Sequence, residues 1–124
     1  MSYRIIVTGS RSWSDVESVR AALVRAARGR TDVTVVDGAA TGVDHVAYCV
    51  ANEMGWATER YPATWADHGK AAGSLRNANM VALGADLCVA FPGSKSVGTW
   101  DCVRRAVAAG IAVWIPSCRG GGRE

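Results

Sequence analysis

Hydrophobic residues along this chain follow two patterns that alternate from one end to the other. Short continuous runs of β-branched and apolar residues are typical of strands buried on both faces of a parallel sheet. Longer stretches with an apolar residue every three or four positions are typical of helices with one buried face. The runs predict about five strands, at residues 4–8, 33–37, 57–61, 87–91 and 111–115.

The first two predicted helices each begin with a capping pattern. Ser14 and Glu17 form a capping box after the first strand, and Thr41 with Asp44 repeats it after the second. The predicted buried faces are Val16, Val19, Leu23 and Ala26 in the first helix, and Val43, Val46, Ala47, Val50 and Met54 in the second.

The chain after the third strand is less regular. Residues 63–73 carry two glycines and are predicted to form a loop or a frayed helix start, whereas residues 74–83 have a clear helical pattern. After the strand at 87–91, Gly98 and Thr99 open the last helix, and Thr99 is the predicted N-cap.

Strands that alternate with helices through short connections predict a parallel sheet with helices on both faces. We expect an α/β fold, a single-domain Rossmann-like three-layer sandwich of about five parallel strands in the order 3-2-1-4-5. Residues 1–116 should form this domain, and residues 117–124 should form a disordered tail.

Composition and charge narrow the function classes. The 124 residues suffice for one core, and the net charge of +3 permits an anionic small ligand but gives only weak support to nucleic-acid binding. The four cysteines have no metal-like spacing, and Cys49 and Cys88 lie in apolar periodic runs, so we expect free buried thiols.

His45 and His68 have no further metal-ligating residues at a recognisable spacing, so no metal is assigned. Without a membrane-length apolar run, a cytoplasmic protein is expected.

Three glycine-bearing turns follow predicted strands and should meet at one edge of the sheet. They lie at residues 9–11, 38–44 and 92–101, and ligands of such sheets bind outside the carboxyl ends of the strands. The third turn joins a strand to a helix N-terminus, where backbone amides and the helix dipole favour an anion. The alternative is that the glycines serve turn geometry alone.

These turns also carry a resemblance to a known family. The motif residues Gly9-Ser10-Arg11, Gly38 to Asp44, Trp65, Arg76-Asn77, Pro92-Gly93 and Gly98 to Asp101 resemble the SLOG superfamily and, within it, the YspA/cpYpsA-related family. The resemblance implies a Rossmann-like domain that binds nucleotides or their derivatives and assembles as a dimer or tetramer. Relatives in that superfamily include the LOG phosphoribohydrolases, the DNA-processing protein DprA and sensor domains for nucleotide messengers.

The resemblance to the LOG enzymes is incomplete at one position. Their motif is Pro-Gly-Gly-x-Gly-Thr-x-x-Glu, whereas the loop here is two residues longer and Cys102 stands where the glutamate would be. Asp101 is the nearest carboxylate, but a neighbouring helical position points about 100° away. Arg76 matches the arginine of those enzymes.

We therefore expect the protein to bind a nucleotide-derived small molecule, either a mononucleotide or an ADP-ribose-like or cyclic ADP-ribose-like compound. It would act as a sensor or a messenger-sequestering protein, without a cofactor. The expected ligand-binding residues are Gly9, Ser10, Arg11, Gly38, Thr41, Gly42, Asp44, Trp65, Arg76, Asn77, Pro92, Gly93, Ser94, Gly98, Thr99 and Asp101.

Alternatives stay open for the whole chain and for single residues. A phosphoribohydrolase would use Asp101 and Arg76 as catalytic residues, and DprA-like binding of single-stranded DNA would need a basic groove. Arg20, Arg25, Arg28 and Arg30 cluster on one helix, although such a face is usually only solvated. Asp44 either caps its helix or contacts a ribose, and Trp65 either stacks on a base or packs in the core.

Overall fold

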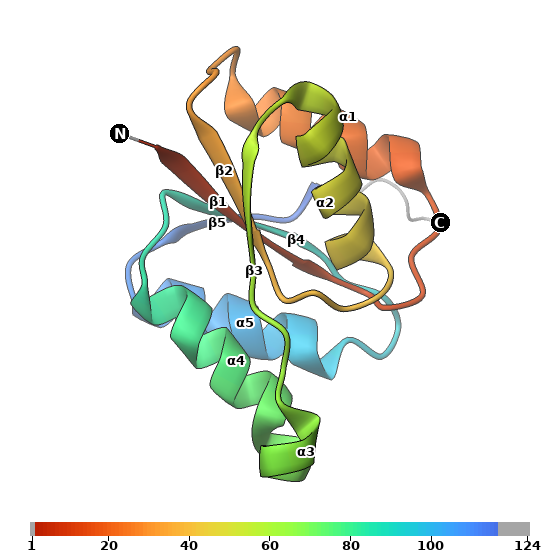
Figure 1. Ribbon diagram of the computed structural model, residues 1–124, viewed down its shortest axis with the longest axis vertical. Helices are drawn as coiled ribbons and strands as arrows, with labels where there is room; N and C mark the ends of the chain where they lie inside the picture. The colour runs from red at the N-terminus through yellow and green to blue at the C-terminus, as the bar shows by residue number, and fades with distance from the viewer. Residues whose placement is uncertain (1, 117–124) are drawn as a thin grey trace.

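A five-stranded parallel sheet runs through the middle of the molecule and carries helices on both faces (Figure 1). This computed structural model describes residues 2–116, so the predicted tail lies outside the described residues. The strand order β3-β2-β1-β4-β5 confirms the predicted order. The strands are β1 (Tyr3–Gly9), β2 (Val33–Asp37), β3 (Ala57–Arg60), β4 (Leu87–Phe91) and β5 (Ala112–Trp114).

The helices divide into two layers, with α1 and α2 on one face of the sheet and α4 and α5 on the other (Figure 1). Their bounds are α1 (Val16–Ala27), α2 (Val43–Met54), α3 (Trp65–His68), α4 (Ala72–Ala82) and α5 (Val97–Ala108), with a single 3₁₀ turn η1 (Gly69–Ala71) between α3 and α4. None of the helices in residues 2–116 combines the length and apolar character needed to cross a membrane.

The sequences of the central strands show no alternating polar positions because helices cover both faces of the sheet. Successive side chains of a strand point to opposite faces, and here each face is buried. Ile5 and Val7 of β1 pack under α1 and α2, whereas Ile6 packs under α4 and α5. All three side chains are 0% exposed, because both faces of β1 are covered by helices. Cys88 of β4 and Cys102 of α5 lie in the core between the sheet and the layer of α4 and α5.

Three helix starts differ from the prediction. The N-cap of α1 is Asp15, which accepts a hydrogen bond from the Ser18 amide at 3.1 Å, so the capping residue is not Ser14. The N-cap of α2 is Gly42, and that of α5 is Ser96 in place of Thr99. In each case two capping-type residues stand within three positions of each other, so the local sequence alone does not decide which one is the cap.

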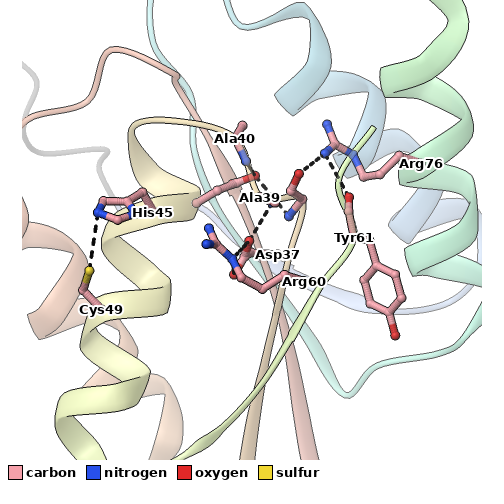
Figure 2. Close-up of polar contacts among 10 residues, drawn as sticks. Asp37, Ala39, Ala40, His45, Cys49, Arg60, Tyr61 and Arg76 are labelled. Carbon is pink, nitrogen blue, oxygen red and sulfur yellow. Dashed lines mark hydrogen bonds and ion pairs between the residues drawn. The ribbon is translucent and has the colours of Figure 1, made fainter. Parts of the chain in front are cut away.

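Two further expectations change in the structure. The irregular segment 63–73 contains α3 and η1 and leads directly into α4, which begins two residues before the predicted start. Cys49 is exposed, not buried, because it lies on the outer side of α2, where its sulfur is 3.6 Å from Nε2 of His45 (Figure 2). Val16 and Met54, predicted to be buried, are 42% and 44% exposed.

Candidate functional site

A large cavity, with a volume of about 740 Å³, opens at the carboxyl ends of β1 and β4. These two strands are neighbours, although β1 is connected to β2 and β4 to β5, so the cavity lies where the strand order reverses. Its lining comes from residues 7–15, at the end of β1 and after it, from residues 93–99 after β4, and from Arg76, Asn77 and Met80 of α4, with Ala40 and Asp44 completing it.

The loop between β4 and α5 presents backbone amides to this cavity. The first helical hydrogen bond runs from the Trp100 amide to the Ser96 carbonyl at 3.0 Å, so the amides at residues 97–99 precede it. The Ser96 hydroxyl instead accepts from the Gly93 amide at 2.6 Å and makes no capping bond within the described chain. The N-terminus of α5 therefore offers unpaired donors and a positive dipole end to an anion.

The turn between β2 and α2 uses its amides internally. Oδ2 of Asp44 accepts from the amides of Gly38 and Ala40 at 3.1 and 3.3 Å, and Asp37 accepts from the Ala39 amide at 2.7 Å (Figure 2). These bonds hold Ala39 at a φ of 58°, which a residue with a side chain rarely adopts. Arg60 pairs with Asp37 at 3.0 Å, which balances the buried charge.

The second oxygen of Asp44 is left for the cavity. Its side chain is 6% exposed and lines the cavity, and among the described residues Oδ1 accepts no hydrogen bond. Burial, with the nearby charge of Asp37, raises the pKa of Asp44 to about 6. Within the described residues, the group is thus a largely buried acceptor with one oxygen available to the cavity.

Arg76 reaches the same edge from α4. Its guanidinium donates to the carbonyls of Gly38 and Tyr61 (Figure 2). Through Nε it also donates to Oδ1 of Asn77 at 2.9 Å. Within residues 2–116 it forms no ion pair with a carboxylate. A Cβ on Gly38 would clash with the guanidinium, so glycine is needed there for this approach. The result is a cation in the cavity wall that is held by backbone and amide acceptors and lies close enough to Asp37 and Asp44 to offset part of the rise that burial causes in the pKa of both.

Asp101 and Cys102, which sequence comparison with the LOG motif singles out, do not line this cavity. Asp101 lies between α4 and α5, where it accepts from Asn77, Ser74 and Arg105 at 3.1, 3.2 and 3.1 Å. Cys102 is 0% exposed and packs in the core. The carboxylates that line the cavity are Asp44 and Asp15, and Asp15 already accepts from the Ser18 amide as the N-cap of α1.

The structure separates the other expected residues into two cavities. Gly9, Ser10, Asn77, Gly93, Ser94, Gly98 and Thr99 line the large cavity, whereas Gly38, Thr41 and Trp65 line a neighbouring cavity of about 340 Å³. Gly42 and Pro92 line neither of these two cavities. Gly42 has a φ of 72° and abuts the backbone of Ser10 and Arg11, which joins the turns after β1 and β2.

Several lining residues were missed by sequence reasoning. Thr8, the residue before the last one of β1, and Ser96, the N-cap residue of α5, are the clearest examples. The signal for Ser96 was present, because a serine directly before a helical segment is a preferred N-cap. Within residues 2–116 no three histidine, cysteine or acidic side chains gather as metal ligands.

Comparison with known proteins identifies the family of this chain and a solved structure of similar fold. Residues 3–68 match the model of the family described as YspA, cpYpsA-related SLOG family. The chain is 42% identical over 120 residues to the Gene 61 protein of Mycobacterium phage D29, which covers 89% of this chain and 93% of that protein. A solved structure of DprA, the DNA processing protein A of Streptococcus pneumoniae, is similar in fold.

The match to DprA has a TM-score of 0.68 and 20% sequence identity, and it covers 90% of this chain. This chain spans about half of that protein, 49% of its length, so the likeness concerns the fold. The family resemblance expected from the motif residues is confirmed by the match over residues 3–68 and by the phage relative. The chain belongs to the YspA, cpYpsA-related SLOG family.

Proposed function

We propose that this protein binds a nucleotide-derived small molecule in the large cavity, as a sensor or as a protein that sequesters a messenger. The observation that carries the proposal is Arg76, a cation without a carboxylate partner in residues 2–116, held beside the open amides of α5. A phosphate would accept from both sets of donors at once. Charge-assisted bonds of this kind are among the strong ones in proteins.

Asp44 completes the proposed ligand contact. Its free Oδ1 is an acceptor in the same wall, and ribose hydroxyls are donors of the right kind for a carboxylate. Asp101, the other carboxylate expected at the ribose, is held by α4 and α5. The ribose contact is therefore assigned to Asp44.

Substitution of Gly98 tests the phosphate position. A Cβ at Gly98 would meet no heavy atom of the described residues within 4 Å, so Gly98→Val should fold while covering the amides. Ala109→Val, an exposed position at the far end of α5, is the matched control. Calorimetry with AMP and ADP-ribose as probes should show binding to the parent and control but not to Gly98→Val. Equal binding by a folded Gly98→Val protein would place the anion site elsewhere.

Hydrolysis of an N-glycosidic bond is the second candidate function, and one observation favours it. The pKa of Asp44, raised by burial to about 6, suits acid–base work near neutral pH. Against it, the position of the LOG glutamate holds the buried thiol of Cys102. We expect no free base above background when the protein is incubated with nucleoside monophosphates. Release that vanishes in Asp44→Asn but persists in Asp101→Asn would promote the hydrolase.

A further inference from the structure

The second cavity shares its boundary with the first. Arg11, Ala40 and Arg76 line both, so a ligand can extend from one into the other between the two arginines. Within residues 2–116 Arg11, like Arg76, forms no ion pair with a carboxylate. Two guanidinium groups at a shared boundary, neither of them ion-paired within the described residues, favour an anionic group that bridges the cavities.

An aromatic platform forms the outer wall of the second cavity. Trp65 is 47% exposed, and the Arg11 guanidinium carbon lies 5.3 Å from the centre of its ring. A Cβ on Gly73 would be only 3.3 Å from Cη2 of Trp65, so the absence of a side chain on α4 lets the ring settle there. A half-exposed indole in a cavity wall is suited to stacking with a planar ring, which would share the ring surface with the Arg11 guanidinium.

The inner wall of the second cavity is fixed by the hydrogen bonds of the β2–α2 turn. Ala39 keeps its positive φ because Asp37 accepts from its amide, and Thr41 donates to the Arg11 carbonyl at 3.0 Å. Strained backbone held by buried acids is typical of a functional site rather than of a passive turn. The cavity therefore combines a rigid wall, an aromatic face and a charged boundary.

We infer that the ligand has two parts, linked by a phosphate group that lies between Arg11 and Arg76. A planar base would stack on Trp65 in the second cavity, while the other part would occupy the large cavity. The inference rests on the proposed function and narrows it from nucleotides in general to nucleotides substituted on both sides of the phosphate. A mononucleotide would fill the large cavity alone.

Trp65→Ala, with AMP and diadenosine diphosphate as calorimetric probes, tests this inference. The parent should bind diadenosine diphosphate more tightly than AMP, and Trp65→Ala should weaken only the former, by roughly 10-fold or more, as expected for one lost base–aromatic stack. Trp65→Phe should retain most of the affinity. Trp100→Ala removes a comparably exposed tryptophan, 41% exposed on α5 and outside both cavities, and should bind both probes like the parent.

Each other outcome overturns the inference in a distinguishable way. If AMP binds but diadenosine diphosphate binds no more tightly, or if Trp65→Ala weakens both equally, the two-part ligand is wrong while the proposed function stands. A deoxyadenosine oligonucleotide serves as a third probe. If Trp65→Ala lowers the affinity for this oligonucleotide only, the second cavity binds a nucleic-acid strand instead. If the parent binds neither AMP nor diadenosine diphosphate, the proposed function fails as well.

Discussion

The two glycine-bearing turns that enter α2 and α5 look alike in sequence and differ in the structure. In the β2–α2 turn, residues 38–42, the amides of Gly38, Ala39 and Ala40 are all bonded to Asp37 or Asp44. In the β4–α5 loop, residues 92–96, the Gly93 amide binds Ser96 and the first turn of α5 is left open to the cavity. One turn is closed by its own side chains, and the other is available to a ligand.

The difference follows from where the carboxylates are. Asp37 ends β2 and Asp44 lies in the first turn of α2, so two acids flank the closed turn. Residues 92–99 contain no acid and include Lys95. A carboxylate in the first turn satisfies the same donors that a phosphate would need. A glycine turn without acids is therefore the better candidate for binding an external anion.

The largest expected effect is the loss of stability in Gly42→Ala, in the closed turn. Gly42 has a φ of 72°, and an added Cβ would collide with the backbone of Ser10 and Arg11, which cannot swing away as a side chain could. Strain and overpacking together should lower the free energy of unfolding by about 3 kcal/mol or more. Urea denaturation measures this change, and a variant as stable as the parent would contradict the closed-turn description.

The second largest expected effect is a loss of affinity when Arg76 of α4 is replaced, because Arg76 is proposed to bind the same phosphate as the open β4–α5 loop. Arg76→Ala should weaken the affinity for AMP roughly 10- to 100-fold, because a charge-assisted phosphate contact is worth about 1.5–3 kcal/mol. Arg76→Lys should recover only part of this, since an ammonium cannot reproduce the guanidinium fork. Arg104→Ala, an exposed arginine on α5, is the charge-matched control for calorimetry. Full affinity in Arg76→Ala would remove this residue from the site.

The third effect is a pH dependence that belongs to the closed turn. The pKa of Asp44 is raised from 3.8 to about 6, so folding favours the protonated acid and the contribution of this group to stability falls as the pH rises from about 4 to about 6. Asp44→Asn can keep both turn bonds, because both amides bind a single oxygen. The stability of the variant relative to the parent should rise by on the order of 2 kcal/mol across this window. Parallel pH profiles of unfolding would refute the assignment.

The smallest expected effect is on the stability of Gly98→Ala, which makes the same glycine-to-alanine change at α5 that Gly42→Ala makes before α2. Gly98→Ala places a methyl where no heavy atom of residues 2–116 lies within 4 Å, and position 98 is helical. The variant should be as stable as the parent or gain up to about 1 kcal/mol, because alanine favours the helix. Thermal melting of Gly98→Ala beside Gly42→Ala would show changes of opposite sign. Destabilisation in both would mean that the α5 turn is also closed.

Much of the fold was predictable from local pattern. The continuous apolar runs identified all five strands, and the alternation with helices was enough to predict the order β3-β2-β1-β4-β5. The edge of the site followed from the same pattern, because the carboxyl ends of parallel strands meet at one side of the sheet. These features depend on burial and on residue spacing, which neighbouring positions in the chain express directly.

Other features could not be predicted because they depend on partners far away in the chain. Arg76 is held by Gly38, and Gly42 needs its conformation because it abuts Ser10, which in turn donates to Phe91. The outward position of Cys49 also depended on packing.

The sequence by itself determined the strands, the helices and the edge where they place the glycine turns, since local periodicity encodes which side chains are buried. Only the tertiary structure decided that Asp44 faces the cavity while Asp101 lies between α4 and α5. It also decided that one turn is closed and the other open, since whether an amide is free depends on whether a distant acceptor reaches it.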